Sequence, residues 1–108
     1  MISFEGNFFI VNGKEIAFNN KIDEVIYYEG LYVVFLMENR IPSNNIFAIN
    51  EAGDVLWNIK DIVKLPIDES YVTASKINNN ELKVISASGI RYSIDVYTKE
   101  IIMKQIIK

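Results

Sequence analysis

The residues of this chain that could do acid–base chemistry are carboxylates, and they occur in three short groups. The groups are Asp23-Glu24, Glu51 with Asp54, and Asp68-Glu69. A glycosidase-like pair needs two carboxylates at a fixed distance across a cleft, one of them with a raised pKa. Neighbouring carboxylates in turns are mostly solvated instead, so we expect no catalysis from these groups.

Histidine and cysteine are both absent from the 108 residues. Their absence excludes a Ser/His/Asp triad, a zinc site with histidine ligands, thiolate chemistry and disulfides. The loop 51–54 lacks the alternating oxygen ligands of an EF-hand calcium site, and the five glycines are isolated turn residues rather than a phosphate-binding loop. The sequence therefore predicts a protein that is not an enzyme and that binds no cofactor or metal.

The charge distribution limits the partners that the protein can have. The formal net charge is −3, the isoelectric point is near 4.9, and the basic residues are scattered. This pattern disfavours direct binding to a nucleic-acid backbone, and it fits a basic protein partner as well as an ordinary solvated surface. No segment is apolar over the length that spans a membrane, and the start MISFEGNFF has no basic segment before an apolar core. We therefore predict no membrane contact and a cytoplasmic location.

Aromatic residues near the carboxylates are the candidates for protein recognition. Trp57 is the single tryptophan, and three tyrosines surround the Glu29-Gly30 turn. Tryptophan and tyrosine favour binding hot spots, although core packing and ordinary cross-strand pairing are the alternatives. At the end of the loop 61–70, the two acids Asp68-Glu69 come shortly before another tyrosine, Tyr71. The predicted partner-binding residues are Asp23, Glu24, Tyr27, Tyr28, Tyr32, Trp57, Asp68, Glu69 and Tyr71.

The elements that would position these side chains are short β-strands. Segments rich in Ile, Val, Tyr and Phe alternate with Asn, Gly and Pro, and apolar residues never keep a helical spacing over three turns. Asn12-Gly13, between 8–11 and 14–18, is typical of a type I′ hairpin turn. The other predicted strands are 25–28, 31–37, 46–49, 55–59, 71–77, 82–87, 90–94 and 101–107.

This pattern predicts an all-β fold, an antiparallel meander of about eight to ten short strands in a single domain. We divide it into an N-terminal hairpin (1–24), a first repeat (25–60) that includes a loop at 38–44, an irregular loop (61–70) with a helical turn near 61–64, and a second repeat (71–108). The segment 31–37 is apolar on both faces. Such a strand lies between two layers or keeps one face for a partner.

The two repeats match each other at an offset of about 45 residues, a spacing within the range of propeller-type repeats. Phe47-Ala48-Ile49-Asn50 matches Tyr92-Ser93-Ile94-Asp95, and Val55-Leu56-Trp57 matches Ile101-Ile102-Met103. Upstream, the segment 31–34 is similar to 82–85.

This pattern resembles the blade repeat of quinoprotein-type (PQQ-like) β-propellers, although the second copy has Met103 in place of Trp and no glycine in its turn. A closed propeller takes about four or more blades. Two repeats and a hairpin are therefore expected to form two blade-like sheets packed as a sandwich or a partly rolled barrel, or to pair between molecules. The quinone cofactor of the complete propeller is not expected here.

In size, acidity and lack of catalytic residues, the chain is similar to immunity proteins of contact-dependent growth inhibition and related polymorphic toxin systems. The resemblance implies a non-catalytic protein-binding module that caps a cognate bacterial toxin, with a basic toxin such as a nuclease as the expected partner. The alternative is a structural or regulatory domain that self-associates, for example as a homodimer.

Overall fold

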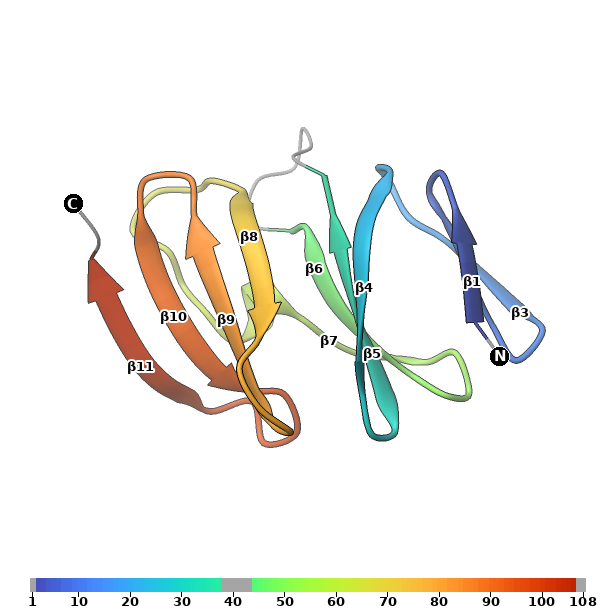
Figure 1. Cartoon of the computed structure of the whole chain (residues 1–108). Coiled ribbons are helices and arrows are strands. Elements are labelled where there is room, and N and C mark those ends of the chain that lie inside the picture. Colours follow the sequence, from blue (N-terminus) through green and yellow to red (C-terminus); the bar gives the residue numbers. More distant parts are fainter. Residues whose placement is uncertain (1, 38–43, 107–108) are drawn as a thin grey trace.

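The computed structural model describes residues 2–37 and 44–106 and confirms the all-β fold (Figure 1). Eleven strands and one 3-10 turn occur in these residues. The strands form three antiparallel sheets that stack as layers, and none of the three, as described, closes into a barrel. Of the two expected arrangements, the layered one is present, with one layer more than expected.

Sheet A, the first layer, contains β1 (Ile2–Glu5), β2 (Phe8–Val11) and β3 (Lys14–Ala17), in that order. The Asn12-Gly13 turn has φ values of 48° and 84°, as a type I′ turn requires. The N-terminal unit is therefore a three-stranded sheet and not a hairpin. Strand β1 was not predicted from the sequence. The turn that joins it to β2 is Gly6-Asn7, the reverse of the Asn-Gly order that marks type I′ hairpins.

Sheet B is the central layer and contains β4 (Ile22–Tyr28), β5 (Leu31–Leu36), β6 (Ile46–Asn50) and β7 (Val55–Asn58). Both of its faces are covered. Val33 and Phe35 of β5 belong to the core shared with sheet C, whereas Val34 and Leu36 belong to the core shared with sheet A. The prediction of a strand between two layers is confirmed. Because β4 begins at residue 22, the boundary predicted at residue 24 is wrong. Most of the predicted loop 38–44 lies outside the described residues.

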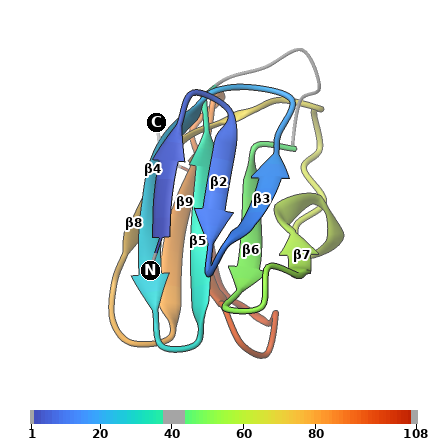
Figure 2. The same ribbon diagram turned by 90° about the vertical axis from the view of Figure 1, so that its right-hand side faces the viewer.

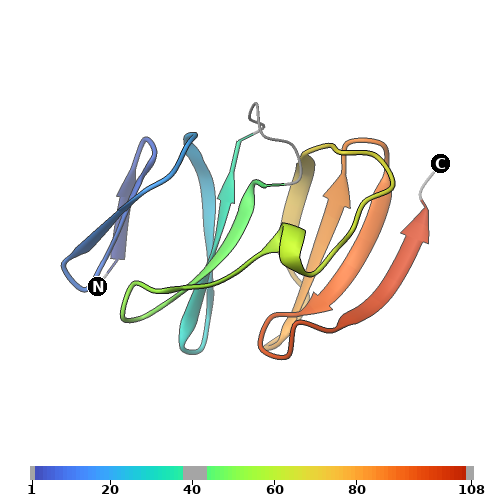
Figure 3. The ribbon, with the colours of Figure 1, turned by 180° about the vertical axis from the view of Figure 1, so that it is seen from behind.

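Sheet C is the third layer, with β8 (Tyr71–Lys76), β9 (Glu81–Ser86), β10 (Ile90–Asp95) and β11 (Ile101–Ile106). The connection from β7 to β8 contains a 3-10 turn, η1 (Ile59–Asp61), which begins with a capping box formed by Asn58 and Asp61. This connection lies between sheets B and C (Figure 3), and Ile59 and Val63 are buried in their shared core. The predicted helical turn is therefore present, two residues earlier than expected.

All three sheets have the same orientation in the stack. Figure 2 shows β1, β4 and β8 along one side, with β3 and β7 along the other. The turns at 12–13, 29–30, 51–54, 77–80 and 96–100 all lie at one end of the molecule (Figure 1). We call this end the turn end. It brings together loops that are far apart in the sequence.

Strand pairing supports the internal repeat in its downstream half. Trp57 of β7 pairs with Ala48, and Met103 of β11 pairs with Ser93. A register shift follows directly after each of these two pairs. Strands β6 and β7 are thus equivalent to β10 and β11, residue for residue, as the sequence match predicts.

The upstream half of the match is wrong by one residue. Ile49 of β6 pairs with Tyr32, and the equivalent Ile94 of β10 pairs with Leu82. Tyr32, and not Leu31, is therefore equivalent to Leu82. A slip of one residue exchanges the two faces of a strand, so the correction decides which side chains of sheets B and C are comparable.

Candidate functional site

Across residues 2–37 and 44–106, no group of three or more Asp, Glu, His or Cys side chains is placed to hold a metal ion. The same part of the chain contains no helix that is long and apolar enough to cross a membrane. The nine residues predicted from the sequence to contact a partner lie in three different parts of the molecule, the core and its two ends.

Three of the nine predicted contact residues lie inside the molecule. Tyr28 and Tyr71 are 0% exposed, and Trp57 is 3% exposed. The Trp57 indole N–H donates to the Val96 carbonyl oxygen at 2.9 Å, and the Tyr28 hydroxyl donates to the Glu81 carbonyl oxygen at 2.7 Å. Burial raises the pKa of Tyr28, which keeps its hydroxyl protonated as a donor. These side chains join sheets B and C and are not accessible to a partner.

The four predicted carboxylates lie at the end opposite to the turn end. They are Asp23 and Glu24 at the start of β4, and Asp68 and Glu69 in the loop before β8 (Figure 1). A Glu69 carboxylate oxygen accepts hydrogen bonds from the Ser88 N–H at 2.9 Å and from the Ser88 hydroxyl at 2.6 Å. Hydrogen bonds from Ser86 and Ser88 lower the pKa of Glu69. This carboxylate therefore stabilises the β9–β10 turn.

The remaining two predicted residues, Tyr27 and Tyr32, lie near the turn end. They are paired across β4 and β5, and their ring centroids are 5.5 Å apart. Tyr32 is half-buried and packs edge-on against Phe9 of sheet A, with ring centroids 5.8 Å apart. Tyr27 is 55% exposed. The structure thus divides the predicted set among the core and the two ends, and only Tyr27 offers a large exposed ring.

Sequence analysis missed Tyr97, which joins Tyr27 at the turn end. The Tyr97 hydroxyl donates to the Glu29 carbonyl oxygen at 2.7 Å, and its side chain is 45% exposed. Burial, followed by the proximity of Glu29, Tyr27 and Asp95, raises the pKa of Tyr97. No local sequence pattern marks this residue, because its contact with the β4–β5 turn exists only when sheets B and C are stacked.

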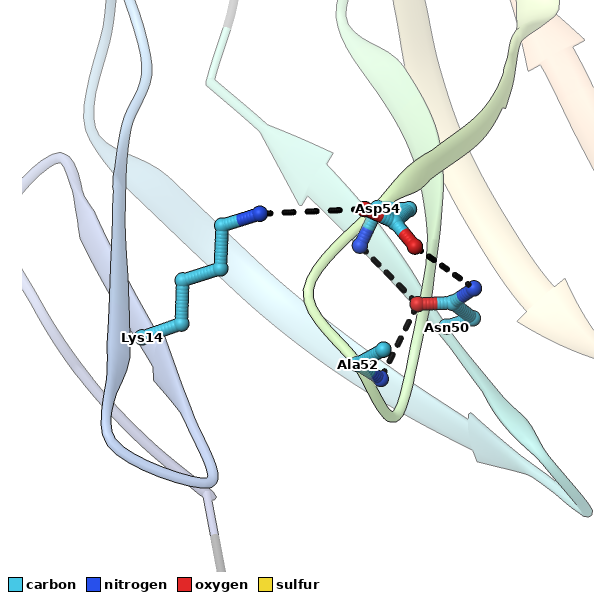
Figure 4. Close-up of polar contacts among 4 residues, drawn as sticks. All are labelled: Lys14, Asn50, Ala52 and Asp54. Carbon is cyan, nitrogen blue, oxygen red and sulfur yellow. Dashed lines mark hydrogen bonds and ion pairs between the residues drawn. The ribbon is translucent and has the colours of Figure 1, made fainter.

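The β6–β7 turn adds two carboxylates to the same end. The Asn50 side-chain oxygen accepts hydrogen bonds from the Ala52 N–H at 3.0 Å and the Asp54 N–H at 2.9 Å (Figure 4). Lys14 of sheet A reaches across to Asp54, with 3.7 Å between its ammonium nitrogen and the carboxylate oxygen. An ion pair this exposed contributes no more than about 1 kcal/mol, so its main effect is to hold the turn in position.

Hydrogen bonds between layers fix the turn end as one unit. The Asn12 side chain of sheet A donates to the Glu51 carbonyl oxygen at 2.8 Å. The Lys76 ammonium of sheet C donates to the Tyr27 carbonyl oxygen at 3.0 Å. Together with the tyrosine bond described above, these contacts connect turns of all three sheets. A surface organised in this way loses little conformational freedom when a partner binds.

We define the turn-end surface as Tyr27, Glu29, Glu51, Asp54 and Tyr97. It combines two exposed aromatic rings with three exposed carboxylates. Aromatic rings supply contact area, and carboxylates pair with lysine and arginine side chains.

The fold and this surface define the class of the protein: an all-β stack of three antiparallel sheets with an aromatic and acidic end. Residues 1–106 match the family described as Domain of unknown function (DUF7957), and the chain belongs to that family. No curated protein and no solved structure matches the sequence. The family description names no activity.

Proposed function

We propose that this protein is a non-catalytic protein-binding module, and most concretely a cytoplasmic immunity protein that neutralises a cognate bacterial toxin by capping it. The observation that supports this proposal is the turn-end surface, where Tyr27 and Tyr97 are 55% and 45% exposed beside Glu29. Tyrosine provides a large contact area at low entropic cost, and such residues are enriched in the centres of protein interfaces.

The charge of the surface favours a basic partner. Glu29, Glu51 and Asp54 are all exposed, and the ion pair with Lys14 balances only one of them. A nuclease toxin presents a basic active site, which these carboxylates could fill while the tyrosine rings pack around it. The proposal thus assigns the electrostatic contact to the turn end instead of to the carboxylates near residues 23 and 68.

The test begins with co-purification of the protein from its native host, where a basic toxin domain should come down in a one-to-one complex. Reversal of two charges, Glu29→Lys with Glu51→Lys, should then slow association with that toxin about tenfold at low salt. The difference should shrink as the ionic strength rises, because salt screens exposed charges.

The matched control is a reversal of two exposed carboxylates at the opposite end, Asp23→Lys with Glu24→Lys, which should leave the association rate unchanged. Replacement of the rings, Tyr27→Ala with Tyr97→Ala, should raise the dissociation rate, because ring area acts after the encounter. Recovery of the protein alone, or an equal effect of both pairs of charge reversals, would contradict the proposal.

Self-association is the second candidate function. It is favoured by the large apolar side chains exposed on the outer faces of the two outer layers, among them Phe8 at 41% and Met103 at 42%. The outer faces of the stack give this candidate a definite geometry.

A further inference from the structure

The outer face of sheet A is built like a contact face but has no layer against it. The strands β2, β6 and β10 each lead into a turn at the turn end, namely 12–13, 51–54 and 96–100. At equivalent distances before that turn, each strand carries an aromatic residue and an isoleucine: Phe8 and Ile10, Phe47 and Ile49, and Tyr92 and Ile94. In sheets B and C these two side chains lie in the core shared with the preceding layer.

In sheet A the same two side chains point away from the stack. The alternating residues Phe9 and Val11 are 0% exposed in the core shared with sheet B, so Phe8 and Ile10 face the opposite side. A hollow of about 510 Å³ lies on this side. Glu5 and Glu15 are exposed at its border, and no basic side chain lines it.

The other end of the stack, the outer face of sheet C, is basic at its centre. Lys83 and Arg91 occupy the positions of Val33 and Ile46 in sheet B, which are both 0% exposed. Ile85 pairs with Arg91 and lies on the same face. The described residues contain no ion pair that involves either of the two basic side chains, although Arg91 donates a hydrogen bond to Gln105.

Two carboxylates also lie on this face, at its turn-end border. Glu81 accepts a hydrogen bond from the Asn78 side chain at 3.2 Å, and Asp95 accepts one from the Asn80 side chain at 2.8 Å. Both carboxylates are thus held by their own turns. The centre of the face carries Lys83, Ile85 and Arg91.

We propose that the outer face of sheet A stacks on the outer face of sheet C of a second copy of this chain, so that the layers continue head to tail. Glu5 stands at the position of Val84 in sheet C. Val84 shares one core cluster with Val33 and Ile46 of sheet B. The same stacking between copies therefore places Glu5 of one copy against the sheet face that carries the residues equivalent to Val33 and Ile46 in the next.

Those equivalents are Lys83 and Arg91, so the internal apolar contact is replaced by opposite charges. Phe8 of the first copy and Ile85 of the second would belong to the same contact, as their equivalents Tyr92 and Phe35 share one core. Symmetric pairing is unfavourable, because sheet A on sheet A brings the exposed carboxylates Glu5 and Glu15 of two copies into one contact, and sheet C on sheet C does the same with Lys83 and Arg91. Charge complementarity thus selects the head-to-tail contact.

A head-to-tail contact gives a closed ring if its rotation closes, and a filament if it does not. In both cases the turn ends of all copies point in the same direction, because the layers keep their orientation. The proposed contact uses only the two outer sheet faces, so it is independent of toxin binding at the turn end.

The experiment uses two charge-reversal variants, Glu5→Lys with Glu15→Lys and Lys83→Glu with Arg91→Glu, each checked for folding by circular dichroism. Light scattering after size exclusion should give the wild-type protein a mass of at least twice the 12.4 kDa of one chain. Each variant alone should be monomeric, because its two outer faces carry like charges. An equimolar mixture of the two variants should recover the assembly, since every contact then joins opposite charges.

The control variant Asp23→Lys with Glu24→Lys should keep the wild-type mass. A wild-type protein that remains monomeric up to the highest soluble concentration would overturn the proposal. So would an assembly that is lost only on reversal of the sheet A charges, which would indicate symmetric pairing of sheet A. Failure of the mixture to assemble, with both variants folded, would overturn it as well.

Discussion

Sheets B and C are two versions of one meander, and they differ where one is covered and the other is not. In sheet B, Val33 and Trp57 are 0% and 3% exposed beneath sheet C. The equivalent residues of sheet C are the half-buried Lys83 and Met103, which is 42% exposed. Strand pairing and bulges are the same in both. The comparison shows that backbone pairing fixes the meander. The polarity and size of the outward-facing side chains depend on whether a further layer lies against them.

The difference continues to the last strand of each sheet. Strand β7 is followed at once by the buried Ile59, whereas all six residues of β11 are exposed. Within β11, Lys104 is the single charged residue, and its ammonium lies 5.9 Å from the centre of the Tyr92 ring. Long apolar edge strands are usually protected by charges, proline or a covering element. Strand β11 therefore belongs to the least covered part of the stack.

The largest expected effect comes from exchanging residues between the two sheets. Val33→Lys places a charge without a partner in the core between sheets B and C, and it should destabilise the protein by about 3–5 kcal/mol. The reverse change at the equivalent position, Lys83→Val, should alter the free energy of unfolding of the monomer by less than about 0.5 kcal/mol, measured at a dilution where the copies do not assemble. Urea unfolding followed by circular dichroism measures both. Equal effects would mean that the two positions are not covered differently.

The second comparison concerns the equivalent residues of β7 and β11. Trp57→Met removes buried ring area and leaves the Val96 carbonyl without its indole donor, so it should cost about 2–4 kcal/mol. Met103→Ala should cost the monomer less than about 1 kcal/mol, because this side chain is half in solvent when no second copy covers it. Thermal unfolding of the two variants gives the ranking. A larger loss at Met103 would show that β11 is covered in solution.

Elements with a local signal were predictable from the sequence. Asn12-Gly13 marks a hairpin through the positive φ values that only a few residue types tolerate, and the structure confirms it. The downstream repeat, with Trp57 equivalent to Met103, was visible because both copies keep the aromatic and aliphatic order. In contrast, the face of each residue in 31–34 could not be assigned, since a slip of one residue leaves an apolar segment looking the same.

The candidate site was less accessible to sequence analysis because it depends on contacts between layers. Tyr97 and Glu29 are 68 residues apart and meet only through the stacking of sheets B and C. The short carboxylate groups appeared equivalent in the sequence, yet Glu69 is engaged by Ser88 whereas Glu51 lies at the turn end. Burial of Tyr28 and Trp57 follows from the same packing and has no local signature.

A third comparison uses pH to separate the two equivalent turns. The first side chain of the turn is Asn50 in sheet B and Asp95 in sheet C, and each accepts two backbone N–H groups. Hydrogen bonds, first from the Thr98 backbone and then from Asn80, lower the pKa of Asp95. The stabilisation by Asp95 is therefore complete above its unfolded pKa of 3.8 and is lost as the pH falls through its lower folded pKa.

The variant Asp95→Asn should remove this contribution and reduce the loss of thermal stability between neutral pH and acid. The variant Asn50→Asp should not add such a contribution to the turn of sheet B, because the Asn50 side-chain nitrogen donates to the Asp54 carboxylate at 3.5 Å and a second carboxylate there would be repelled. Thermal midpoints measured as a function of pH report both variants against the wild-type protein, whose Glu69 contribution is common to all three. A pH profile that is unchanged in Asp95→Asn would refute the role of this carboxylate.

The smallest effect concerns the residue that ends each of these turns. Gly13 and Gly53 have φ values of 84° and 86°, and Lys99 has a φ of 66° at the equivalent place in sheet C. Left-handed backbone costs a residue with a side chain about 1–2 kcal/mol, whereas glycine adopts it freely but loses more entropy on folding. Lys99→Gly should therefore stabilise the protein by about 0.5–1 kcal/mol, the difference between these two terms.

The opposite change tests the same position in sheet B. A Cβ at residue 53 would lie 2.5 Å from the Lys14 side chain, so Gly53→Ala combines backbone strain with displacement of the ion pair to Asp54. It should destabilise the protein by about 1–2 kcal/mol. Chemical unfolding resolves both variants. If Lys99→Gly were destabilising, the lysine side chain would have to make a contact in sheet C that offsets its strained backbone, and the two turns would not be equivalent.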